Sequence, residues 1–142
     1  MILVDSNVLL YVANSQAEQH SIALKTLEET IQSGPWAFSW NLAYEFFRVS
    51  THPRIFSKPL RLEDAHGFVH DFMESPTFHL IQETSEHLEV SAACAKETHR
   101  LSGNLVHDFH TAVMMREHGI KEILTFDRDF HAFPWVAVKL PR

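Results

Sequence analysis

The sequence predicts an α/β fold with a largely parallel central sheet. Short apolar runs typical of buried strands alternate with longer stretches of helical periodicity along the chain. Two of these runs, which begin at Ile2 and Glu122, lead into aspartates at Asp5 and Asp127. The 142 residues are 45% hydrophobic and 21% charged, which fits one globular domain over residues 1–142.

The first elements follow from short apolar runs and from the residues that end them. Ile2-Leu3-Val4 has the length and composition of a short buried strand. Apolar residues at helical spacing then predict a helix over residues 21–33, which Gly34 and Pro35 end. A second strand is expected at residues 36–39, directly after this break.

The next helix is expected to begin at Asn41, a favourable N-cap residue, and to run to about Ser50. In it Leu42, Phe46 and Val49 have the i, i+4, i+7 spacing of an apolar face. Further along, the same patterns predict helices at about residues 62–74, 85–99 and 106–118, and strands at 78–81, 122–127 and 135–138.

Composition also narrows the class of protein. No apolar stretch reaches the roughly 18 residues of a membrane span. A secretory signal is not expected, because the N-terminus lacks a basic segment and Asp5 interrupts its apolar run. The single cysteine, Cys94, excludes an internal disulfide and is expected to be a small packing residue. These features together favour the cytoplasm. The formal net charge of −6 does not favour a polyanionic ligand unless bound cations or local basic patches reverse the sign.

Four carboxylates are candidates for one site. Asp5 and Asp127 end predicted strands, and ligands of open α/β sheets bind beyond the carboxyl ends of the strands. If these strands are parallel neighbours, the two carboxylates share one crevice. Glu45 lies one helical residue from an apolar face, which predicts partial burial, and Asp108 lies in the first turn of its helix. Asp129 follows Asp127 by two residues. Carboxylates that close repel unless a cation lies between them, and such a set suits Mg²⁺ or Mn²⁺.

Each acid also has a simpler interpretation. An aspartate at a strand end is commonly a turn residue or a helix N-cap. Asp108 could only complement its helix dipole, and Glu45 could pair with Arg48 three residues later. Spacing alone leaves these alternatives open.

At this point the chain resembles a known family. "VDSNVLLYV", "YEFFRV", "HDFHTAVMMREHG" and "ILTFDRDF" resemble the four acidic motifs of PIN domains, in the expected order and over nearly the whole chain. The compact length resembles the VapC-type toxins of bacterial toxin–antitoxin pairs, and "THPRIFSKPL" resembles a subgroup of them. The resemblance implies a three-layer PIN-like sandwich, with helices on both sides of the sheet.

The resemblance also implies roles for individual residues. Asp5, Glu45, Asp108 and Asp127 match the acids that bind metal and catalyse, and Ser6, Asn7 and Asp129 match supporting positions. Phe109 departs from the small residue common after the third acid, which puts the local packing in doubt.

The implied activity is endoribonucleolytic cleavage that depends on Mg²⁺ or Mn²⁺, with a metal-activated water attacking the scissile phosphate in line. The implied partners are an RNA substrate, a cognate antitoxin protein and a second copy of the chain in a homodimer, with no membrane.

Basic residues near the motifs are candidate RNA contacts. Arg54 and Lys58 lie in a predicted loop with Phe56 between them, a combination that suits phosphates and bases but also fits a solvated loop. Arg48 and Arg128 adjoin acidic motifs and could either contact phosphate or only neutralise the acids.

The 11 histidines suggest zinc only weakly. His66 and His70 are four residues apart, and His107 and His110 are three apart, but a zinc site usually needs three or four nitrogen or sulfur ligands. A minor role in catalysis or RNA contact remains open for the second pair. The aromatic residues are most simply core, although some could form a dimer surface or receive an antitoxin helix: Trp36, Trp40, Phe46, Phe47, Phe72 and Phe109.

Other protein classes fit less well. A phosphoacceptor receiver domain needs paired acids after the first strand and a central aspartate, and here "VDSN" offers one acid. A haloacid-dehalogenase-type phosphatase needs Asp-x-Asp, but Asn7 occupies the second place. A catalytically silent PIN fold that only binds a partner is the remaining alternative, and the presence of all four acids argues against it.

Overall fold

The five strands form one parallel sheet. The computed structural model describes residues 1–99, 101 and 103–142. The strand order is β3-β2-β1-β4-β5, and every neighbouring pair is parallel, as the alternation of strands and helices predicts. The strands are β1 (Ile2–Val4), β2 (Trp36–Ser39), β3 (Phe78–Ile81), β4 (Glu122–Leu124) and β5 (Ala137–Lys139).

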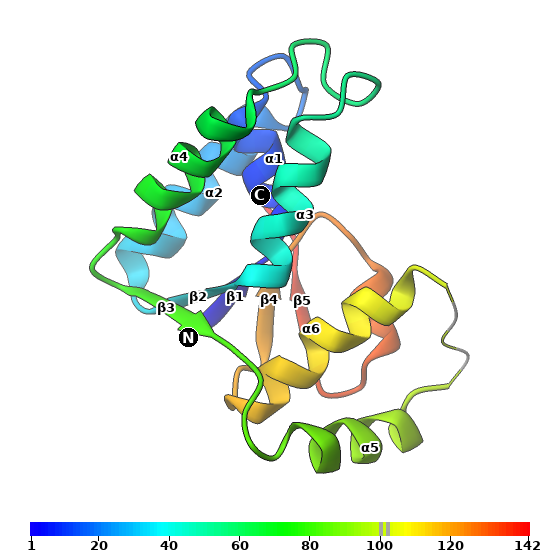
Figure 1. Ribbon diagram of the computed structural model, residues 1–142. Coiled ribbons are helices and arrows are strands. Elements are labelled where there is room, and N and C mark those ends of the chain that lie inside the picture. Colours follow the sequence, from blue (N-terminus) through cyan, green and yellow to red (C-terminus); the bar gives the residue numbers. More distant parts are fainter. Residues whose placement is uncertain (100, 102) are drawn as a thin grey trace.

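Helices cover both faces of this sheet, which confirms the three-layer prediction. The helices are α1 (Ser6–Ala13), α2 (His20–Ser33), α3 (Trp40–Ser50), α4 (Leu62–Met73), α5 (His87–Glu97) and α6 (Leu105–Glu117), with a 3₁₀ turn, η1, at Asp129–Ala132. Helices α1 to α4 lie on one side of the sheet and α5 and α6 on the other (Figure 1). This division follows from right-handed crossovers, because the chain moves from β1 to β2 and β3 in one direction and then returns to β4.

The point where the chain reverses direction places the site. Strand β1 pairs with β2 on one edge and with β4 on the other. Open α/β sheets bind ligands at such a reversal, beyond the carboxyl ends of the strands. Asp5 follows β1 directly, and Asp127 follows β4 by three residues, because the strand ends at Leu124 and not at Asp127 as predicted.

Several predicted boundaries differ from the structure. The apolar stretch after Asp5 forms α1, which the sequence analysis did not assign, and Val8 and Leu9 of that helix are buried. Asn41 is not an N-cap, because α3 begins at Trp40 after Ser39. Helix α5 is shorter than predicted at both ends, and the last strand begins two residues later than predicted.

The core prediction for the aromatic residues is largely confirmed. Trp36, Phe46 and Phe47 are buried, and Phe72 and Phe109 pack against the core. Phe109 packs against Phe133, with ring centroids 6.2 Å apart, so a large side chain fits after Asp108. Trp40 is 44% exposed, and its assignment to the core is wrong. Cys94 is a buried free cysteine. Within the described ranges, no helix has the length and apolar character that crossing a membrane requires.

Candidate active site

A pocket of about 800 Å³ lies between α3, the first turn of α6 and the loop after β4. Its lining contains three of the four predicted metal-binding acids together with polar, aromatic and basic residues: Asn41, Tyr44, Glu45, Arg48, Asn104, Leu105, His107, Asp108, Asp127 and Asp129. A second pocket, of about 440 Å³, lies at the other end of β1 and β4. Two charged residues of this second pocket, Glu122 and Lys139, neutralise each other in an ion pair of 3.0 Å. The first pocket, with its cluster of acids, is therefore the better candidate.

Three carboxylates converge in this pocket. Oxygen atoms of Asp108, Asp127 and Asp129 all lie within 4.8 Å of one another. Asp129 is positioned by its own backbone N–H, which donates to Oδ1 of Asp127 at 2.8 Å. Hard divalent cations prefer such oxygen donors, so the donor set fits Mg²⁺ or Mn²⁺. Asp129, which was expected only to support the site, therefore lies among the clustered carboxylates.

Asp5 is linked to Asp127 through the Thr125 hydroxyl and is almost fully enclosed. Its side chain is held by the backbone N–H of Ser6 at 2.7 Å, by Nδ2 of Asn7 at 3.0 Å and by the Thr125 hydroxyl at 2.6 Å. Burial raises the pKa of Asp5 to about 6; the Thr125 hydrogen bond opposes this rise and the negative charge of Glu45 adds to it. The ionised form of Asp5 is thus unfavourable unless positive charge is nearby.

Thr125 connects the first and fourth acidic motifs, and the sequence analysis missed it. Its hydroxyl donates to Asp5 and accepts from Nδ2 of Asn7 and from the backbone N–H of Asp127, both at 2.9 Å. Asn7 adds a second connection, because its side-chain oxygen accepts from the N–H of Phe126 at 3.1 Å. A threonine two residues before a loop aspartate was the available signal, since such hydroxyls commonly bond nearby backbone.

Asp108 experiences the combined charge of the cluster. Its pKa is raised to about 7, mainly by burial and in addition by the negative charges of Asp5, Asp127, Glu45 and Asp129. The negative charges of four other acids therefore act on this one carboxylate. Asp108 also lies in the first turn of α6, as predicted.

Glu45 differs from its prediction in one respect. It lines the pocket, but it is exposed and not partly buried. The alternative pairing with Arg48 is absent from the ion pairs of the described residues. Arg48 also lines the pocket, one helical turn beyond Glu45, so an exposed cation adjoins the acids.

The other predicted RNA contacts lie outside the pocket lining. Arg54, Lys58 and Arg128 are exposed, but none of them lines the pocket. Phe56 is only 6% exposed, so its predicted role as an aromatic contact between the basic residues is wrong. The loop is a solvated surface around one buried aromatic anchor.

The histidines do not form a metal centre in the described part of the chain, where the only candidate group is the aspartate cluster. His66 stacks on Phe47, and His110 pairs with Glu83 at 2.6 Å. His107 alone among them lines the pocket.

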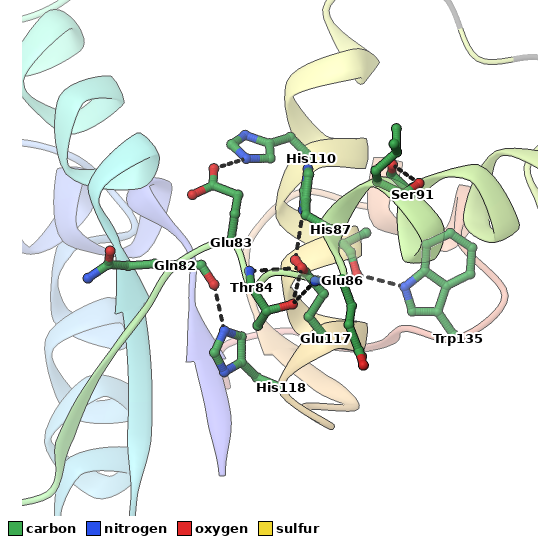
Figure 2. A network of polar contacts seen from close by, with 12 residues as sticks. Gln82, Glu83, Thr84, Glu86, His87, Ser91, His110, Glu117, His118 and Trp135 are labelled. Atoms are coloured by element: carbon green, nitrogen blue, oxygen red, sulfur yellow. Dashed lines mark hydrogen bonds and ion pairs between the residues drawn. The ribbon is translucent and has the colours of Figure 1, made fainter.

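A buried carboxylate fixes the far end of α6. The Glu117 side chain is fully enclosed, and it accepts from the N–H and hydroxyl of Thr84 at 3.0 and 2.7 Å and from Nδ1 of His87 at 2.8 Å. Figure 2 shows these contacts joining the β3–α5 connection to α6, with His118 bonded to the carbonyl of Gln82 at 2.7 Å. Because Asp108 lies at the other end of the same helix, this network holds the helix that positions it.

A second contact fixes α6 beside α3. Nδ2 of Asn41 donates to the Thr111 hydroxyl at 3.0 Å, and the Asn41 side-chain oxygen accepts from the Ser39 hydroxyl. Asn41 and Glu45 share one face of α3, and Asp108 and Thr111 share one face of α6. The hydrogen bond therefore sets the separation of the two helices that carry these acids.

Comparison with known proteins agrees with this geometry. The model of the PIN domain family matches residues 2–136. This chain belongs to the PIN domain family. Among curated proteins it is 33% identical to Ribonuclease VapC37 of Mycobacterium tuberculosis, over 96% of this chain and 94% of the relative. It is 32% identical to Ribonuclease VapC48 of the same organism, with the same coverage.

Solved structures share the fold at lower identity. VapBC2 from Rickettsia felis, bound to a DNA fragment from its promoter, superposes with a TM-score of 0.72 over the full length of both chains at 16% identity. Mycobacterium tuberculosis VapC20, described as a Sarcin-Ricin loop cleaving toxin, gives a TM-score of 0.66 at 19% identity and covers 96% of this chain and 98% of that one.

Proposed function

We propose that this PIN domain protein is a divalent-metal-dependent endoribonuclease that acts as the toxin of a toxin–antitoxin pair. The observation that carries the proposal is the convergence of Asp108, Asp127 and Asp129 in one pocket, with the buried Asp5 linked to Asp127 through Thr125. Identity above 30% to proteins named as VapC ribonucleases supports the same activity. The pocket is open to solvent, as access for a polymer requires.

Asp108, Asp127 and Asp129 would hold a Mg²⁺ or Mn²⁺ ion, with Asp5 and Glu45 adjacent to them. When bound, the ion supplies neutralising charge for a phosphate and lowers the pKa of a coordinated water. The elevated pKa values of Asp5 and Asp108 support this assignment, because a cation would offset both the burial that raises them most and the added repulsion from neighbouring acids.

The remaining groups would position the substrate. Arg48 lies at the pocket wall, where its guanidinium neutralises a backbone phosphate that enters beside the acids. Carboxylate oxygens of the cluster accept hydrogen bonds from the attacking water and orient it for in-line displacement. The hydrogen bonds of Thr125 and Asn7 hold Asp5 and Asp127 in fixed positions relative to each other during this step.

The proposal includes partners and a place of action. The similar Rickettsia chain comes from an assembly named VapBC2, which supports a separate antitoxin chain as a partner. We further expect a homodimer acting on RNA in the cytoplasm. Size-exclusion chromatography with light scattering, with and without a co-expressed antitoxin protein, tests both assemblies.

The activity test compares purified protein, free of antitoxin, on a pool of structured RNA with Mg²⁺, with Mn²⁺ and with chelator. Asp5→Asn and Asp108→Asn are expected to lower the cleavage rate by about 100-fold or more, because each removes charge from the cation site. Asp71→Asn is the matched control, since Asp71 is an exposed carboxylate on α4 outside the pocket.

The outcomes of this test distinguish the proposed nuclease from its alternatives. Metal-dependent cleavage that the two pocket variants abolish and the control retains supports the nuclease. Equal cleavage by parent and pocket variants would mean that a contaminant cuts the RNA or that the site is wrongly assigned. Absence of cleavage by folded parent protein on every RNA would favour the alternative, a PIN fold that only binds a partner.

A further inference from the structure

We propose that Tyr44 is the stacking platform for an unpaired RNA base next to the scissile phosphate. The inference rests on the proposed nuclease function and names a residue that determines how the substrate sits. It assigns a substrate contact to Tyr44, the first residue of the motif "YEFFRV", in addition to the metal-binding role proposed for the acids. The occupant is a single base of the RNA, extruded from its neighbours.

The first observation is the position of Tyr44 on α3. Asn41, Tyr44, Glu45 and Arg48 have the i, i+3, i+4, i+7 spacing of one helix face, and all four line the acidic pocket. Tyr44 therefore lies beside Glu45 and one turn before Arg48, about 6 Å along the helix axis. A phosphate bound between the acids and Arg48 would carry its attached nucleotide past the Tyr44 ring.

The second observation is the exposure of the ring. Tyr44 is 68% exposed, although it forms part of a pocket wall. A single exposed aromatic residue elsewhere on a surface needs no explanation. Here the exposed ring adjoins a cluster of carboxylates and an arginine, which is the combination of stacking surface and phosphate-binding charge that single-stranded RNA sites use.

The third observation is that the ring is supported from behind. Tyr44 packs edge to face with Phe47, with centroids 5.5 Å apart and an interplanar angle of 73°. Phe47 is itself only 8% exposed. An anchored ring loses little freedom when a base stacks on its open face, which favours a specific contact over a transient one.

The test is a double-mutant cycle in which one change is made in the protein and the other in the RNA, singly and together. One arm changes Tyr44→Ala, and the other replaces single nucleotides on either side of the cleaved bond by an abasic ribose. At the stacked position each change alone is expected to lower kcat/KM roughly 5- to 150-fold, and both changes together should cost no more than one. Tyr44→Phe keeps the ring and should restore the dependence on the base.

Trp40→Ala is the matched control. Trp40 is an exposed aromatic residue on the same helix, one turn before Tyr44, but it does not line the pocket. Its substitution should show no coupling to any abasic position. Thermal unfolding of each variant checks that the fold is retained, which is expected because most of the Tyr44 side chain contacts solvent.

The same cycle is repeated on RNA affinity in the Asp5→Asn background. If the parent protein does not cleave RNA, the proposed function fails, while coupling in affinity still supports the stack. Independent losses at every position would overturn the stack and leave Tyr44 a packing residue. Normal cleavage by Tyr44→Ala combined with weaker inhibition by a protein partner would overturn it in favour of a protein contact.

Discussion

The hydroxyl of Thr125 makes three hydrogen bonds, to Asp5, Asn7 and the backbone of Asp127, and it is fully buried. Thr125→Val keeps the shape of the side chain but removes all three. We expect a loss of about 1–3 kcal/mol in the free energy of unfolding, because buried polar groups lose their partner. The cleavage rate should fall roughly 10- to 100-fold, as for other residues that orient metal-binding groups.

Thr125→Ser is the matched control for this prediction, because it retains the hydroxyl and loses only a methyl group. Urea unfolding and initial cleavage rates measure the two effects. Full activity in Thr125→Val would show that Asp5 and Asp127 are positioned without the hydroxyl, and the connection between the two motifs would then be incidental.

Helix α6 depends on a carboxylate at the end remote from the pocket. Burial alone would raise the pKa of Glu117, but hydrogen bonds from His87 and Thr84 outweigh it and hold that pKa below its ordinary value. Glu117→Ala should therefore lower the free energy of unfolding by about 2–4 kcal/mol, since charged hydrogen bonds to Thr84 and His87 are lost together. The depressed pKa also means that this stabilisation is present at neutral pH and is lost as the pH falls below 4.5.

Glu97→Ala is the comparison, because Glu97 pairs with Arg116 near the same end of α6 but both side chains are substantially exposed. An exposed pair contributes about 0–1 kcal/mol. Chemical denaturation at pH 7 measures both variants. Similar losses in the two would contradict the view that the enclosed network, rather than surface charge, fixes the helix.

The elements show which parts of the fold the sequence specifies locally. Strands β1 to β3 are short apolar runs between turn residues, and the predicted ranges match closely. Helix α1 was missed because its sequence is apolar on nearly all sides, which hides helical periodicity. Asn41 was misassigned because its side chain bonds Thr111, 70 residues away, and a long-range partner leaves no local signal.

The site shows the same limit at the scale of the whole molecule. The four acids were predicted from motifs, because their spacing and strand context are local. Thr125 can bond both Asp5 and the backbone of Asp127 only because β4 pairs with β1. The exposure of Glu45 depends on how α3 packs. These properties arise only when distant elements meet, so sequence patterns alone did not contain them.

Metal and pH should act together on global stability. The pKa of Asp5 rises from 3.8 to about 6 on folding, and that of Asp108 from 3.8 to about 7. The folded state therefore binds these protons more tightly than the unfolded state, so metal-free stability should fall as pH rises from about 4 to 7. For Asp5 the difference corresponds to about 3 kcal/mol.

Added Mn²⁺ or Mg²⁺ should reverse this loss, because cations bind the ionised carboxylates and stabilise the fold that presents them. We expect the metal-induced rise in Tm to be several degrees larger at pH 8 than at pH 5, and to shrink in Asp108→Asn. Differential scanning fluorimetry with chelator and with each metal measures it. An equal metal-induced rise in Tm at both pH values would show that the metal does not bind through the ionised forms of these carboxylates.

The order of the strands has a consequence for how the protein is made. Asp5 lies at the start of the chain, whereas Thr125, which bonds it, lies 120 residues later on the loop after β4. During translation the early helices and strands can form while the acidic pocket still lacks one wall. A ribosome-bound fragment that stops before β4 holds three of the four motif acids, Asp5, Glu45 and Asp108, but it lacks Asp127 and Thr125. We therefore expect the proposed nuclease to be inactive until the loop after β4 has been made, because that loop supplies Thr125 and Asp127.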